Sequence, residues 1–97
     1  NHAAHHIVAA RAKAADASRL ILRDFKIGLD EAVNGVFLPQ NMFGRAANST
    51  AAYHPKLHTG VYYEEVYNRL AEATTKEEAR SILRSIAAEL EAGTFVF

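Results

Sequence analysis

The sequence contains no cysteine, which excludes disulfide bonds and zinc sites built from thiolates. Any metal site must therefore use histidine, carboxylate or water ligands. The chain also lacks an apolar run approaching the roughly 20 residues of a membrane-spanning helix, and no segment resembles a signal peptide. A His-Glu-x-x-His motif is missing as well, which argues against a metalloprotease.

At 97 residues, the chain fits one domain, and we expect it to form a single unit over residues 1–97. Hydrophobic residues make up 49% of it, but alanine supplies many of them and buries little area per residue. A bound metal or partner would help to hold such a thin core. Because a candidate site follows closely on Asn1, we expect the chain to be a piece of a longer protein.

The formal net charge is zero, which argues against a strong nonspecific nucleic-acid binder, but the charges are unevenly distributed. Residues 1–58 carry seven basic and four acidic side chains, a net charge of +3, and residues 59–97 carry the reverse, −3. All five histidines lie in the basic part. A phosphate-bearing ligand would therefore be attracted to the part of the chain that holds the histidines.

The histidines fall in two clusters, one formed by His2, His5 and His6 and the other by His54 and His58. Either cluster alone is more simply explained as solvated loop or helix surface. Together they favour a metal site, because neutral imidazole is the commonest protein ligand for zinc, copper, nickel and iron. Three ligands would leave one histidine of the two paired motifs free to act as a base, which is typical of a catalytic site rather than a closed structural one.

Two short apolar segments predict a small antiparallel sheet. We expect Ile7-Val8 to form a brief strand or an extended entry into the domain, and Val36-Phe37-Leu38, closed by Pro39, to form the strand that pairs with it. The Asn34-Gly35 pair tolerates positive φ and predicts a chain reversal before the second strand.

An alanine-rich segment without glycine or proline predicts a helix from Ala9 to Phe25, ended by Gly28. A single helical turn capped by Asp30 is expected to follow. Four positions of the long helix share an inward stripe: Ala15, Ser18, Leu22 and Phe25. Four basic residues on its exposed side form either an ordinary solvated face or a surface that follows a phosphate backbone: Arg11, Lys13, Arg19 and Arg23.

The segment Gln40–Ala52 is polar and aperiodic, which predicts a loop. His54 and His58 are four residues apart, a spacing that places two side chains on one face of a helix. Alternatively, Thr59 caps a helix that runs from about Gly60 to Ala73 and the two histidines lie in the turn before it. The sequence leaves both possibilities open.

The clearest helix signal begins at Thr75, which forms a capping box with Glu78. Apolar residues then recur at helical spacing until Gly93, which predicts the end of this helix. We expect Phe95-Val96-Phe97 to fold back onto the core.

Three motifs, in order along the chain, resemble those of the AHH nuclease family, a branch of the HNH and endonuclease VII superfamily. They are Ala4-His5-His6-Ile7-Val8, Asn34-Gly35-Val36-Phe37-Leu38-Pro39, and His54-x-x-x-His58 followed by Tyr62-Tyr63. The resemblance covers roughly residues 4–70. It implies a mostly helical α+β fold, in which a ββα-metal core with additional helices surrounds one divalent ion and hydrolyses phosphodiester bonds in DNA.

The resemblance also implies roles for single residues. His5, His54 and His58 resemble the metal ligands, and His6 resembles the general base that activates water. Asn34 resembles the residue that holds the base-bearing strand in place through side-chain hydrogen bonds. The ion is zinc, magnesium, manganese or nickel, because imidazole ligands alone do not choose between them.

Members of this family are C-terminal toxin domains of bacterial polymorphic and contact-delivered effectors, including type VI secretion effectors. The resemblance therefore implies a carrier effector protein upstream, a DNA substrate in the target-cell cytoplasm, and a cognate immunity protein. Two alternatives stay open. One is a non-catalytic helical module whose four-histidine zinc site supports a weak core, and the other is an RNase of the same fold.

Overall fold

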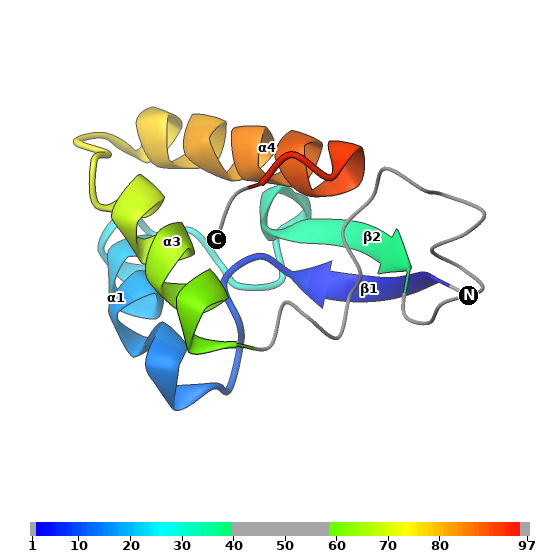
Figure 1. Cartoon of the computed structure of the whole chain (residues 1–97). Coiled ribbons are helices and arrows are strands. Elements are labelled where there is room, and N and C mark those ends of the chain that lie inside the picture. Colours follow the sequence, from blue (N-terminus) through cyan, green and yellow to red (C-terminus); the bar gives the residue numbers. More distant parts are fainter. Residues whose placement is uncertain (1, 40–58, 96–97) are drawn as a thin grey trace.

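The computed structural model describes residues 2–39 and 59–95 of the chain (Figure 1). Its mostly helical α+β architecture, with a two-stranded antiparallel sheet, confirms the predicted fold class. In chain order, the described elements are β1 (His2–His6), the 3-10 turn η1 (Lys13–Ala15), α1 (Asp16–Asp24), the 3-10 turn η2 (Ala32–Asn34), β2 (Gly35–Pro39), α3 (Gly60–Leu70) and α4 (Lys76–Ala92).

The two strands pair antiparallel as predicted, but the first strand lies earlier in the chain than expected. His5 lies opposite Val36 and His6 opposite Gly35, and the strand ends there. The prediction that Ile7-Val8 forms this strand was therefore wrong. Both residues are buried in the core, so their apolar character reflects burial rather than strand pairing.

The first helix starts later than the sequence predicted. α1 begins at Asp16, and Ala12 before it has extended backbone angles, φ −63° and ψ 130°. The guanidinium of Arg19 donates from Nη1 to Ala9 O at 2.7 Å, which holds the segment before the helix in a non-helical path. The predicted inward stripe is confirmed, with buried or half-buried side chains at Ala15, Ser18, Leu22 and Phe25.

The end of α1 also differs from the prediction, because Lys26 rather than Gly28 ends the helix. Lys26 takes the left-handed conformation, with φ 59°. Its N–H donates to Arg23 O at 2.9 Å, and Ile27 N–H donates to Leu22 O at 2.8 Å, which together form a Schellman motif. The tertiary position of buried Ile27 thus fixes where the helix stops.

Two predictions for the segment between α1 and β2 were wrong. Asp30 does not cap a helical turn, because η2 follows Glu31 and has no side-chain cap. Gly35 is extended, with φ −120° and ψ 147°, so Asn34-Gly35 is not a positive-φ turn. Asn34 is instead the last residue of η2, and its side chain is buried and used in tertiary hydrogen bonds.

Both later helices begin at threonine caps. Thr59 Oγ1 accepts the N–H of Tyr62 at 3.3 Å, so α3 starts after Thr59, and it ends at Leu70, before the predicted Ala73. Thr75 Oγ1 accepts the N–H of Glu78 at 3.1 Å, which confirms the predicted start of α4. Gly93 closes α4 with φ 75°, also as predicted.

Several expectations concern residues outside the described ranges. They are the loop at 40–52, the place of His54 and His58 before or on a helix, and the contacts of residues 96 and 97.

Helix α3 packs against both α1 and α4, and α4 lies along β2 (Figure 1). Tyr62 of α3 is fully buried at the centre of this arrangement, together with Leu70 of the same helix and Leu83 of α4. Phe95 folds back onto this core as predicted, with its ring centroid 5.8 Å from that of Tyr62. None of the helices described is long and apolar enough to cross a bilayer.

Candidate active site

Strand β1 sends its last two side chains to opposite faces of the sheet, because neighbouring residues of a strand alternate in direction. His5 is buried, with 4% of its surface exposed, and His6 is half-buried. The two histidines therefore have different environments although they are adjacent in sequence. One is suited to a fixed, shielded role and the other to contact with solvent or a ligand.

The tautomer of His5 follows from its hydrogen bonds to α3. The hydroxyl of Tyr62 donates to Ile7 O at 2.9 Å, and it lies 3.0 Å from His5 Nε2. Since the single hydroxyl proton goes to the carbonyl, His5 Nε2–H must donate to the tyrosine oxygen. Burial raises the pKa of Tyr62, so the hydroxyl keeps this proton. His5 thus carries its proton on Nε2 and its ring lone pair on Nδ1.

Asn34 fixes the backbone immediately after the histidine pair. Its Oδ1 accepts Val8 N–H at 2.8 Å, and its Nδ2 donates to Val8 O at 3.1 Å and to Leu29 O at 3.0 Å. The backbone of Asn34 contributes as well, since its carbonyl accepts Ile7 N–H at 2.8 Å. A fully buried amide with its side-chain groups satisfied holds residues 7 and 8 in one position.

His6 has a carboxylate partner that the sequence did not reveal. Its Nε2 lies 3.0 Å from Asp30 Oδ1, across 24 positions of sequence. Asp30 was expected to cap a helical turn, and no local pattern indicated its role beside His6. The side chain of Asp30 is 96% exposed, so the pair is strongly screened by solvent, and its main effect is on the orientation of the imidazole.

Both histidines line two separate hollows of the surface. One, of about 350 Å³, is also lined by Arg11, Tyr63 and several alanines. The other, of about 280 Å³, is also lined by Asp30 and Glu31. Ala4 contributes to both. The histidine pair therefore separates a basic hollow from an acidic one.

Only His5 of the three expected metal ligands lies within the described residues. Among residues 2–39 and 59–95, no group of three histidine or carboxylate side chains is arranged to hold a metal ion. His54 and His58 lie outside these ranges. His5 itself fits a metal ligand, because its Nε2–H is bonded to an outer partner and its Nδ1 carries the lone pair, the usual arrangement of a metal-binding histidine.

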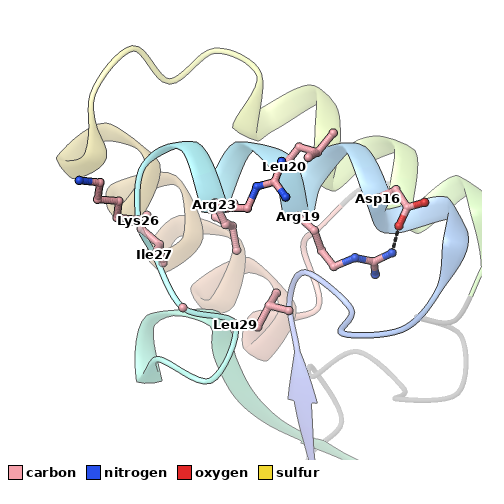
Figure 2. Close-up of a pocket in the computed structure, with 9 residues that line it drawn as sticks. Asp16, Arg19, Leu20, Arg23, Lys26, Ile27 and Leu29 are labelled. Atoms are coloured by element: carbon pink, nitrogen blue, oxygen red, sulfur yellow. Dashed lines mark hydrogen bonds and ion pairs between the residues drawn. The ribbon is translucent and has the colours of Figure 1, made fainter.

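A hollow larger than these two lies against one face of α1 (Figure 2). It measures about 890 Å³ and runs between α1 and the segment around Leu29. Leu20, 48% exposed, lies beside the basic side chains Arg19 and Arg23, with Lys26 further along. Arg19 is paired with Asp16, the one acidic residue of this lining. The sequence indicated the basic residues but not this apolar hollow.

Comparison with known protein families identifies the family of this chain. A family model described as AHH, a nuclease family of the HNH/ENDO VII superfamily with conserved AHH, matches residues 1–90. The chain belongs to the AHH family. No curated protein and no solved structure gives a significant match to it.

Membership of the AHH family agrees with the architecture around His5 and His6. The antiparallel pair β1–β2 followed by α3 is consistent with an HNH-like ββα fold, and the conserved AHH corresponds to Ala4, His5 and His6 at the end of β1. The family indicates an endonuclease domain with hydrolytic activity and implies a DNA substrate. Nucleases of this superfamily generally use a divalent metal ion.

Proposed function

We propose that this AHH domain is a metal-dependent endonuclease that hydrolyses phosphodiester bonds in DNA, with His6 as general base. The observation that carries the proposal is the pairing, at the end of one strand, of a buried histidine with a fixed tautomer and a half-buried histidine with a carboxylate partner. Asn34 holds the backbone directly after both of them. This arrangement supports two different roles for two adjacent imidazoles.

His6 is suited to proton transfer because Asp30 orients it. When Nε2–H donates to the Asp30 carboxylate, Nδ1 is the nitrogen that accepts a proton from water. The same contact holds the imidazole ring in this orientation during the transfer. Positioned histidine bases of this kind typically contribute about 10²–10⁴-fold to a hydrolytic rate.

For the metal, we propose His5, His54 and His58 as ligands of one divalent ion, with zinc, magnesium, manganese and nickel as candidates. A bound ion with an open position would neutralise charge on the phosphoryl oxygens and on the leaving alkoxide. The support for His5 is its shielded position and the Tyr62 hydroxyl that accepts its Nε2–H.

The nuclease assignment is tested with purified protein and plasmid DNA in the presence of each of the four ions. We expect wild type to degrade the plasmid and His6→Ala to lose this activity while keeping its thermal melting temperature. His2→Ala is the matched control, since it removes a nearby histidine with no assigned role. Activity of His6→Ala near that of wild type would contradict the role of His6. Cleavage of RNA instead of DNA would favour the RNase alternative.

The structural-zinc alternative makes the opposite prediction for stability. If four histidines only hold the fold together, His6→Ala should lower the melting temperature as much as His5→Ala or His58→Ala. It should also have no activity to lose, because wild type would be inactive with every ion. Melting curves with and without a chelator therefore distinguish a catalytic metal site from a structural zinc site.

We further propose that the domain is the C-terminal toxin of a larger bacterial effector, delivered to the cytoplasm of a target cell by its upstream carrier. A nuclease that can attack the chromosome of the cell that makes it requires a cognate immunity protein. The hollow along α1 fits an acidic protein of this kind, because the apolar side chains of Leu20 and Leu29 line it together with the basic side chains of Arg23 and Lys26 (Figure 2). Charge complementarity would speed association and exclude wrong partners.

Expression in a bacterial cytoplasm tests the toxin proposal. We expect wild type to cause DNA loss and growth arrest, His6→Ala to be harmless, and the neighbouring downstream gene to restore growth. A Leu20→Glu variant should stay toxic but escape this protection, because a carboxylate would replace an apolar lining residue and face an acidic partner. Equal protection against wild type and Leu20→Glu would show that the inhibitor binds another surface of the domain.

A further inference from the structure

The two hollows that share His5 and His6 offer a substrate phosphate two opposite environments. The 280 Å³ hollow is lined by the carboxylates of Asp30 and Glu31 and by no basic side chain other than the histidines. The 350 Å³ hollow has Arg11 as its charged residue beside the histidines, and no carboxylate among its lining. A phosphodiester carries a negative charge, so the electrostatic energy favours the side of Arg11.

From this difference, we propose that the phosphodiester binds in the hollow between β1 and the segment at residues 9–12, and that Arg11 binds its non-bridging oxygens. This assignment rests on the proposed nuclease function and adds the side from which the substrate approaches. The sequence predicted Arg11 on the exposed face of a helix, but the structure places it elsewhere. Arg11 lies before η1, in the bend that follows the strand of the histidines.

Arg11 is available for such a contact, whereas other arginines are used by the fold. Arg19 is bonded to Ala9 O and Asp16, and Arg69 and Arg80 are held by glutamates. Within the part of the chain that the structure describes, Arg11 is exposed and makes no hydrogen bond or ion pair. An unpaired guanidinium matches two phosphate oxygens at once, which an ammonium cannot do.

Two contacts fix the backbone just before Arg11. Asn34 bonds the N–H and the carbonyl of Val8, and the guanidinium of Arg19 donates to Ala9 O at 2.7 Å. Arg11 follows two residues later. Preorganisation of this kind lowers the entropy lost when a side chain orders around a ligand.

Small side chains next to Arg11 leave room for the ligand. Ala9, Ala10 and Ala12 line the same hollow and end at Cβ, so no side chain of this segment other than that of Arg11 reaches further. Arg11 and the two histidines thus supply the basic groups of the hollow, and the ring of Tyr63 forms part of its wall.

The binding test uses the His6→Ala background with a chelator present, so that neither cleavage nor a metal ion contributes. A fluorescein-labelled DNA duplex is titrated with His6→Ala, His6→Ala/Arg11→Ala and His6→Ala/Arg84→Ala at several salt concentrations. Arg84 is the matched control, because it is an exposed arginine on α4 that does not line this hollow. We expect Arg11→Ala to weaken binding and to reduce the salt slope by about one, and Arg84→Ala to change neither.

The cleavage test uses the same substitutions with an intact His6. We expect Arg11→Ala to lower the cleavage rate by about 10²-fold or more, as for loss of a donor that meets transition-state charge. The cleavage rate of Arg11→Lys should lie between those of wild type and Arg11→Ala, because lysine keeps the charge but not the paired donors. Circular dichroism and thermal melts of each variant confirm that the fold is retained.

The two tests separate the possible failures. Equal effects of Arg11→Ala and Arg84→Ala on both binding and cleavage would overturn the assignment of Arg11. If wild type cleaves nothing but Arg11→Ala alone weakens duplex binding, the nuclease proposal fails and the phosphate contact stands.

Discussion

The hydroxyl of Tyr62 lies 3.0 Å from His5 Nε2, and it joins the end of strand β1 to the first turn of α3. Because the hydroxyl donates its own proton to Ile7 O, it can only accept from His5. One side chain thus sets the tautomer of a candidate metal ligand and holds the backbone beside it. This contact spans 57 positions of sequence.

The first prediction concerns this hydroxyl. Tyr62→Phe should retain the fold but lose about 1–3 kcal/mol of unfolding free energy, because it leaves a buried carbonyl and a buried N–H without their partner. It should also weaken divalent-ion binding by about 10–100-fold, as is typical when an outer partner of a metal-binding histidine is removed. Urea unfolding and calorimetric titration measure the two effects. Tyr67→Phe, at a side chain 40% exposed, is the control and should change neither.

The second prediction concerns Asn34. Asn34→Ala should lower the unfolding free energy by about 2–5 kcal/mol, because it leaves buried backbone groups of Val8 and Leu29 unpaired. Asn34→Asp should be at least as damaging, since it places a carboxylate against two carbonyl oxygens. Denaturant unfolding of both variants is the measurement. A stable Asn34→Asp protein would show that the amide donors are unimportant.

The third prediction concerns the metal ligands. His5→Ala and His58→Ala should weaken the binding of zinc, nickel or manganese more than Tyr62→Phe does, and His54→Ala should have an equal or smaller effect. Calorimetric titration into chelator-stripped protein decides this, with His2→Ala as the control that keeps full affinity. Unchanged affinity of His58→Ala would rule out the proposed ligand set.

The fourth prediction concerns acid stability. The Arg69 guanidinium donates to both oxygens of Glu89, at 3.0 and 2.8 Å, and holds the pKa of that carboxyl below its usual value of 4.5. A lowered folded-state pKa stabilises the fold above the unfolded-state value, and this stabilisation is lost as the pH falls through the folded-state value. Glu89→Gln should therefore lower the unfolding free energy at about pH 7 and much less at about pH 3.

The size of this acid effect should be modest, because the side chains of Arg69 and Glu89 are 32% and 31% exposed and solvent screens their attraction. Glu91→Gln is the control, at an exposed carboxylate on the same helix. Equal losses for Glu89→Gln at both pH values would show that packing rather than charge explains its effect.

Features that depend on neighbouring residues were predictable from the sequence. The Thr75 cap, the apolar spacing of α4 and Gly93 at its end are all confirmed, because caps and amphipathic stripes are properties of a few adjacent positions. The Glu78 carboxylate, expected to complete a capping box, accepts the N–H of Thr74 at 2.7 Å. Local patterns also indicated the β2 strand and, through the order of motifs, the AHH family. The family, the fold class and the adjacent pair His5-His6 are therefore predictable from local patterns.

Tertiary contacts decided the remaining features. Ile7-Val8 has the composition of a strand, but burial in the core and hydrogen bonds to Asn34 take it out of the sheet. The start of α1 depends on the bond from Arg19 to Ala9, and its end depends on the burial of Ile27. In each case, a contact formed in the folded chain outweighed a local propensity of a few tenths of a kcal/mol to about 1 kcal/mol per residue.

The details of the candidate site belong to this second group. Three features of the site bring together residues that are far apart in sequence or on different elements. They are Tyr62 beside His5, Asp30 beside His6, and Arg11 in a hollow that the two histidines and Tyr63 also line. The sequence reveals the two histidines because their motif is continuous. It does not reveal their partners, because a hydrogen bond or a charge across a hollow depends on distance in space, which only the tertiary fold fixes.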